Sequence, residues 1–147
     1  MRVAAHLIAG GFGLGRAPVA SGTVAAFAAT LLGAVLLALS PWLLAAAALG
    51  ATLGGVWAIT AARAEGDPGW VVIDEIAGQW ITLLALPRPA PWWLLAAFVL
   101  FRVLDIAKPG PIGWADRRGG PVSVMADDVI AGAIGAVLLL AARAILV

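Results

Sequence analysis

The stretch between Arg16 and Arg63 contains no charged residue, and this feature limits most strongly what the chain can fold into. A helix that crosses a membrane needs roughly 20 consecutive apolar residues. The stretch is long enough for two such helices, and its only strong break is Ser40-Pro41. We therefore expect two membrane helices, over about 21–39 and 41–62, that are joined by a tight turn.

The composition supports a membrane protein. Of the 147 residues, 63% are hydrophobic and only 12% are charged, whereas soluble domains hold about 25% charged residues. No basic run points to a nucleic-acid partner. The absence of cysteine excludes disulfides, thiolate zinc sites and cysteine nucleophiles. We expect an all-α integral membrane bundle in which residues 1–147 form a single membrane-embedded domain.

Three further apolar segments complete the expected bundle. The turn at Asp67-Pro68-Gly69 precedes a second hairpin, with arms over about 70–86 and 92–108. A loop rich in glycine and proline then leads into a last helix over about 127–146. The sequence thus predicts about five membrane helices with short polar loops on the cytosolic side.

The distribution of charge predicts how the bundle is oriented. Most of the nine basic residues fall on one side of the expected bundle: Arg2, Arg16, Arg63, Arg102, Lys108, Arg117 and Arg118. The other side holds Arg88 and Arg143, so the positive-inside rule makes the first side cytoplasmic. All eight acidic residues lie between positions 65 and 128 and fall on or near that same side.

Five of these acids are expected to converge at a similar depth. Three separate segments carry Asp74 with Glu75, Asp105, and Asp127 with Asp128. Carboxylates held this close repel one another unless a cation lies among them, and burying each in a membrane costs about 2.5–3.5 kcal/mol. Oxygen ligands with no cysteine suit magnesium or manganese better than zinc. An alternative for the last pair is structural, with Asp127 capping the final helix and Asp128 favouring its dipole.

Two cations flank one of these acids. Arg102, Asp105 and Lys108 are spaced to share one broad helix face. They could form only a ladder of ion pairs, or the cations could clamp a phosphate beside a metal. Because Lys108 precedes Pro109, we expect the helix to end there, which leaves the lysine side chain free to reach the aqueous mouth.

The start of the first membrane helix is a candidate anion site. Ser21 or Thr23 could cap this helix, and its free N–H groups could bind an anion. The glycines before it could allow close approach to a ligand, or they could serve turns and helix packing. We interpret His6, on an apolar stretch, as a packing or interfacial residue.

Four stretches carry a resemblance to a known family: GFGLGRAPVASGT, VVIDEIAGQWITLLALP, FVLFRVLDIAKPGPIGWADR and MADDVIAGAIGA. In order and spacing they resemble the phosphatidylglycerophosphatase A family, over nearly the whole chain from Gly10 to Ala136. The resemblance implies a bacterial inner-membrane phosphatase that requires magnesium. Such an enzyme removes the terminal phosphate of phosphatidylglycerophosphate, a membrane lipid, to give phosphatidylglycerol.

Metal-assisted hydrolysis is the mechanism that these residues allow. The expected ligands of magnesium, or of manganese in its place, are Asp74, Glu75, Asp105 and Asp128. One of these carboxylates, or Asp127, would act as the general base. The expected phosphate-binding residues are Arg102, Lys108, Ser21 and Thr23. We favour direct attack by water over an aspartyl-phosphate intermediate.

Two other classes of protein could use the same features. A small cation-coupled transporter could bind its ion at the carboxylates, although the acids lie on one side and no inverted repeat is present. A binding or assembly subunit could use the small-residue helix faces. Magnesium-dependent release of phosphate from a lipid distinguishes the enzyme from both.

Overall fold

The computed structural model describes all 147 residues; its regular elements are all helices, and it has no strand. Its elements, in chain order, are α1 (Arg2–Ala9), the 3₁₀ segment η1 (Gly11–Arg16), α2 (Ser21–Leu39), α3 (Pro41–Ala62), α4 (Ile73–Leu83), α5 (Pro91–Ala107), α6 (Pro111–Asp116) and α7 (Pro121–Leu146). The predicted all-α class is confirmed.

The first hairpin has the predicted bounds. Ser40 separates α2 from α3, and its hydroxyl accepts a hydrogen bond from the backbone N–H of Trp42 at 3.2 Å. Pro41 occupies the first turn of α3, where its missing N–H leaves no bond unmade. A proline at the helix start and a capping serine before it therefore fix this boundary locally.

Three helices, α2, α3 and α7, are long and apolar enough to cross a membrane. The expectation of about five is not confirmed, because α4 has only 11 residues and α5 has 17. At 1.5 Å per residue, α4 is about half as long as the ~30 Å hydrocarbon layer is thick. The apolar residues before α4 are not helical, since the N–H of Val72 bonds to the carbonyl of Ala9 at 2.9 Å.

The last helix begins earlier than predicted. It starts at Pro121, after Gly120 with a φ of 86°, and not near residue 127. Asp127 and Asp128 consequently lie in its second turn, so the interpretation of Asp127 as an N-cap is wrong. The expected loop before it also contains the short helix α6.

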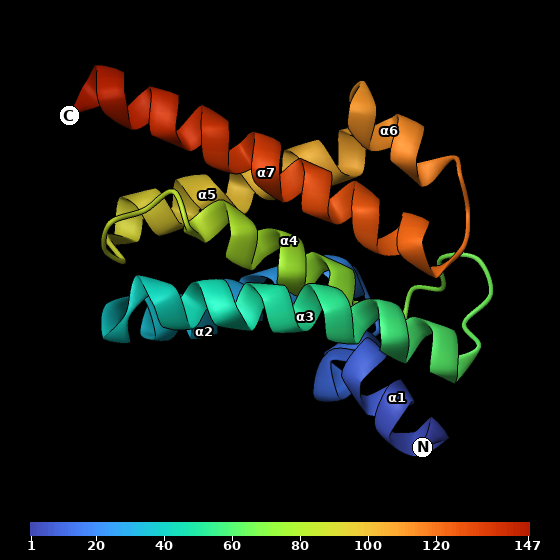
Figure 1. The fold of residues 1–147 in the computed structure, drawn as a ribbon. Coiled ribbons are helices and arrows are strands. Elements are labelled where there is room, and N and C mark those ends of the chain that lie inside the picture. Colours follow the sequence, from blue (N-terminus) through green and yellow to red (C-terminus); the bar gives the residue numbers. More distant parts are fainter.

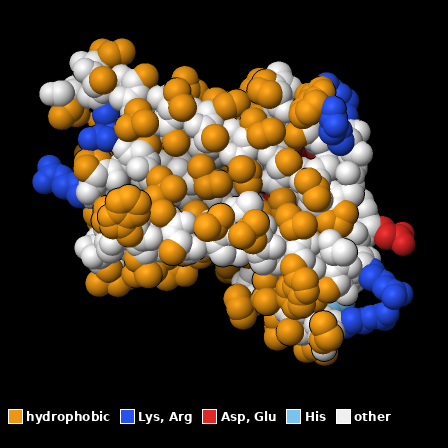
Figure 2. Space-filling view, viewed as in Figure 1, with side chains coloured by type: hydrophobic (Ala, Val, Ile, Leu, Met, Phe, Trp, Pro, Cys, Tyr) orange, Lys and Arg blue, Asp and Glu red, His pale blue; other side chains and the backbone are white.

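Figure 1 shows α4 in the middle of the molecule, between the α2–α3 hairpin and the layer of α5 and α7. The helix packs against all four of these neighbours. The N-terminus and the C-terminus lie at opposite ends of the long direction, and the loop after α3 lies at the same end as α6 (Figure 1). Hydrophobic side chains cover much of the flank between these ends, while basic side chains gather near the ends (Figure 2). This distribution suits a bundle surrounded by lipid.

Candidate active site

Three carboxylates from two helices form a compact group, which we call the carboxylate cluster. Asp74 and Glu75 lie in the first turn of α4, and Asp128 lies in the second turn of α7. One oxygen from each lies within 4.8 Å of the others. Asp74 and Asp128 are buried, with 4% and 2% of their surface exposed.

A glycine-to-glycine contact brings the two helices together. A Cβ added at Gly132 of α7 would lie 3.0 Å from the Cα of Gly78 in α4 and even closer to its carbonyl oxygen. Asp128 and Asp74 lie four residues before these glycines, which places each acid one turn away on the same helix face. Small residues at this contact therefore position the carboxylates from α4 and α7 beside one another.

The carboxylate cluster retains unused oxygen atoms. Asp74 Oδ1, Glu75 Oε2 and Asp128 Oδ2 are buried and have no hydrogen-bond partner in the protein. Buried anionic oxygens without partners are costly unless a cation compensates for them. Three carboxylates without any nitrogen or sulfur donor are the ligand type that magnesium and manganese prefer. The residues therefore fit a divalent cation.

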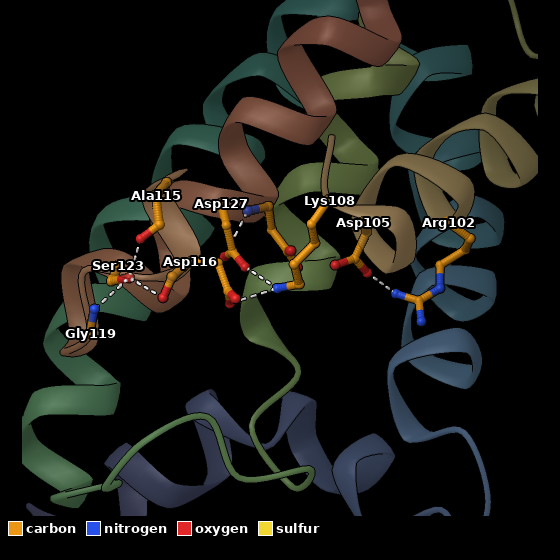
Figure 3. Close-up of polar contacts among 9 residues, drawn as sticks. Arg102, Asp105, Lys108, Ala115, Asp116, Gly119, Ser123 and Asp127 are labelled. Atoms are coloured by element: carbon orange, nitrogen blue, oxygen red, sulfur yellow. Dashed lines mark hydrogen bonds and ion pairs between the residues drawn. The ribbon is translucent and has the colours of Figure 1, made fainter. Parts of the chain in front are cut away.

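Asp105 lies next to the cluster but not within its compact group of ligand atoms. Its carboxylate forms an ion pair with Arg102, one turn earlier in α5 (Figure 3). Arg102 Nε is buried and has no partner. The structure thus brings Asp105 to the site while leaving one donor of Arg102 unused.

Gly22, at the start of α2, completes this side of the site and was not among the predicted site residues. A Cβ added there would lie 3.1 Å from Glu75 Cδ and 3.3 Å from Arg102 Nη2. A larger residue at this position would push the ends of these two side chains away from their present places. The signal in the sequence is the small residue that separates Ser21 from Thr23.

The side chains of Ser21 and Thr23 differ from prediction. The residue that caps α2 is Ala20, in a left-handed conformation with φ 50°, and no side chain caps the helix. The hydroxyl of Ser21 instead donates to the carbonyl of Gly69 at 2.5 Å, which fixes the loop that leads to α4. Thr23 is half-buried and makes no side-chain hydrogen bond. The capping prediction is therefore wrong for both residues.

Lys108 connects three helices at the edge of the site. It follows the last residue of α5 in a left-handed conformation with φ 48°, which confirms that the helix ends there. Its Nζ donates to Asp116 of α6 at 2.8 Å and also to Asp127 of α7 (Figure 3). The expected ladder is therefore only half formed, because Lys108 does not pair with Asp105.

The ion pair between Lys108 and Asp116 holds the lysine and the aspartate in their charged forms. The hydrogen bond from Lys108 lowers the pKa of Asp116 below its usual value. Partial burial opposes the charged form of Lys108, but its bonds to Asp116 and Asp127 outweigh burial and raise the lysine pKa. Asp116 was not predicted as a site residue. Its pairing with Lys108 depends on the packing of α6 against α7, which the sequence does not reveal.

Hydrogen bonds in the loop before α7 hold α6 and α7 in their relative positions. The hydroxyl of Ser123 donates to the carbonyl of Ala115 at 2.5 Å and accepts from the N–H of Gly119 at 3.1 Å (Figure 3). These bonds tie the end of α6 to the first turn of α7. They fix the relative positions of Asp116 and Asp127, which Lys108 joins.

Comparison with known proteins identifies a family and several named relatives. The sequence pattern of the family described as phosphatidylglycerophosphatase A matches residues 7–143. The Escherichia coli protein named phosphatidylglycerophosphatase A is 42% identical over 139 residues, which cover 91% of this chain and 80% of that protein. The Haemophilus influenzae protein of the same name is 42% identical over 141 residues, covering 92% and 86%.

A third relative carries a different name. The Bacteroides thetaiotaomicron protein named "Putative phosphatidylinositol-3-phosphatase" is 40% identical over 146 residues, which cover 93% of this chain and 92% of that protein. No solved structure matches the chain. The family match and the extent of the similarity lead to one conclusion: the chain belongs to the phosphatidylglycerophosphatase A family.

Proposed function

We propose that this protein is a magnesium-dependent membrane phosphatase that hydrolyses the terminal phosphomonoester of phosphatidylglycerophosphate. The products are phosphatidylglycerol and inorganic phosphate. Membership of the family supports a phosphatase with this substrate. The observation that carries the metal requirement is the carboxylate cluster, whose three buried oxygens have no protein partner.

Asp74, Glu75 and Asp128 would hold the magnesium ion, with Asp105 beside them as the fourth carboxylate. Manganese is the alternative ion because it accepts the same oxygen donors. When bound, the ion supplies Lewis-acid polarisation of a phosphoryl oxygen and lowers the pKa of water. The same ion would offset the repulsion among the carboxylates.

The cations of the site would recognise the phosphate. Arg102 is held by Asp105, and its buried Nε–H, which has no protein partner, would donate to a phosphoryl oxygen that enters beside it. A phosphomonoester carries nearly two charges, so a fixed guanidinium favours it over the singly charged phosphodiester of the same lipid. The first turn of α2 at Gly22 would limit how the phosphate enters.

Asp127 is the best-placed general base. It lies outside the carboxylate cluster, next to Asp128, and is held in place by Lys108. In the proposed step, Asp127 accepts a proton from the attacking water as the water oxygen bonds to phosphorus. The bond from phosphorus to the glycerol oxygen breaks, that oxygen takes a proton from a second water molecule, and Asp127 then returns its own proton to the solvent. Lys108 thus acts as a positioning residue as well as a local positive charge.

The site is proposed to face the cytosol of the bacterial inner membrane. All acidic residues, and most basic ones, belong to segments at or near the end where α1, the loop after α3 and α6 lie. The positive-inside rule assigns that end to the cytoplasm. A cytosolic site also gives released phosphate direct access to water.

Phosphate release by the purified protein tests the proposal. With phosphatidylglycerophosphate in mixed micelles, we expect release that requires magnesium and stops when the metal is chelated. Asp74→Asn and Asp128→Asn should nearly abolish turnover, while Glu65→Gln, an exposed acid in the loop after α3, should behave as wild type. Release that is unaffected by chelation would refute the metal mechanism, and no release from a folded protein would refute the activity.

The relative from Bacteroides supports one second candidate, a phosphatase for a phosphorylated inositol lipid. Both substrates present a phosphomonoester on a phospholipid headgroup. The same assay with the two lipids in parallel compares their kcat/KM values. A higher value for the inositol lipid would favour the second candidate without changing the role of the carboxylate cluster.

A further inference from the structure

A basic pocket lies between α1, η1 and Trp70, outside the carboxylate cluster. Its volume is about 700 Å³, within the 300–1,000 Å³ that typical ligand sites occupy. Two arginines, Arg2 and Arg16, line it, and no acidic residue does. Neither arginine forms an ion pair with the protein. The pocket therefore presents two unpaired cations.

The wall of the basic pocket is built by close packing. The rings of His6 and Trp70 stack with centroids 5.1 Å apart and an interplanar angle of 14°. His6 Nδ1 donates to the carbonyl of Arg2 at 2.8 Å, which fixes the orientation of the ring. A Cβ added at Gly15 would lie 3.1 Å from Trp70 Cα and closer still to its carbonyl group. These contacts hold α1 and η1 against the loop before α4.

An apolar groove adjoins the basic pocket. Its volume is about 400 Å³, and it runs between η1, α2 and α4. Phe12 lines both cavities and is 79% exposed, in a left-handed conformation with φ 54°. The groove continues along Leu32 of α2 and Trp80 of α4, at the depth of the membrane helices. A cationic pocket next to an apolar groove, with Phe12 lining both, matches the polarity of a phospholipid headgroup and its acyl chain.

The groove lies on a different face of α4 from the carboxylate cluster. With about 100° between successive helical residues, Ile76 and Trp80 project away from Asp74 and Gly78. Ile76 and Trp80 line the groove, whereas Gly78 contacts α7. A lipid in the groove would therefore touch α4 without placing its headgroup among the carboxylates.

We infer that the basic pocket and the apolar groove form one accessory site for an anionic phospholipid, distinct from the reacting lipid. Arg2 and Arg16 bind its phosphodiester, and one acyl chain lies along Leu32 and Trp80. The exposed apolar side chains of α1, Val3 and Leu7, place this helix at the membrane interface. The occupant secures α1 and η1 against the start of α4, next to Glu75.

Native mass spectrometry of the full-length protein released from nanodiscs tests this inference. The nanodiscs contain equal amounts of phosphatidylglycerol, which has no phosphomonoester to react, and phosphatidylcholine. We expect one retained phosphatidylglycerol per chain. In the double variant Arg2→Gln/Arg16→Gln, the ratio of retained phosphatidylglycerol to retained phosphatidylcholine should fall roughly 30-fold. Each interfacial arginine favours anionic lipid by about 1 kcal/mol, or about fivefold, and the two effects multiply. Leu32→Trp, which fills the groove, should also release the lipid.

Matched controls are Arg88→Gln, at the opposite end, and Leu53→Trp, an exposed leucine of α3 outside the groove. Both should retain the lipid, and thermal melts establish that every variant is folded. Equal retention of the two lipids by wild type, or unchanged retention by the double arginine variant, overturns the inference. Loss of binding of unreacted substrate to Asp128→Asn when Arg2 and Arg16 are also replaced by glutamine would instead make this pocket the binding site of the reacting lipid, which also overturns the inference. Retention is measured without turnover, so a failure of the proposed phosphatase activity is seen separately.

Discussion

Replacement of Gly132 by alanine tests how the fold positions the carboxylates. The new methyl group would lie 3.0 Å from Gly78 Cα and closer than 3.0 Å to the Gly78 carbonyl oxygen. Real Cβ atoms essentially never come within 3.0 Å of a backbone atom in this way. Because neither backbone atom can rotate away, α4 and α7 must separate. Overpacking of this kind lowers the free energy of unfolding by about 1–3 kcal/mol. The better helix propensity of alanine offsets up to about 1 kcal/mol of this loss.

The larger effect of Gly132→Ala should be on activity. The helices separate one turn from Asp74 and Asp128, and a displacement of about 1 Å in an active site costs on the order of 10²-fold in rate. We expect kcat/KM to fall by about that factor while the melting temperature falls only by several degrees. Gly54→Ala in α3 is the matched control, because its Cβ would meet nothing within 4 Å. Equal kcat/KM values for the two variants would refute the role of the glycine contact.

Three further predictions follow from the site and the charge distribution. Gly22→Ala should raise the magnesium concentration that gives half-maximal phosphate release several-fold, and unchanged titration curves would exclude α2 from the site. Lys108→Met should lower kcat per folded enzyme by about 10²-fold. The same variant should lose the stability that the Lys108–Asp116 pair contributes. In the wild type this contribution is present above the ordinary aspartate pKa of 3.8, and it is lost as the pH falls through the lowered pKa of Asp116. Thermal melts of both proteins from about pH 3 to pH 7 test this. Single cysteines at positions 65 and 88 should label from the cytosolic and outer sides respectively, and the reverse pattern would overturn the orientation.

The first hairpin could be predicted to the residue because its determinants are local. A charge-free run, a capping serine and a proline at the first turn all lie in the sequence itself. The length of α4 could not be predicted, because apolar residues before it are held by a tertiary bond from Val72 to Ala9. Hydrophobicity alone does not distinguish a membrane helix from an extended segment packed in the core.

The convergence of the acidic residues could be predicted from the sequence, but the ion-pair partners of Lys108 and the helix contact beneath the carboxylates could not. Buried carboxylates are costly, so their convergence was expected from the positions of the charges. The partners of Lys108 depend on its left-handed conformation and on α6, neither of which the spacing of residues along α5 reveals. The contact between Gly78 and Gly132 depends likewise on how two helices cross.

Direct binding of a divalent cation tests the central claim most closely. Manganese can replace magnesium at oxygen ligands, and its electron paramagnetic resonance signal reports free and bound ion without any need for turnover. We expect the wild-type protein and Glu65→Gln to bind manganese in competition with magnesium, and Asp128→Asn to bind it at least tenfold more weakly. If Asp128→Asn and Glu75→Gln both bind manganese as tightly as wild type, the carboxylate cluster is not the metal site.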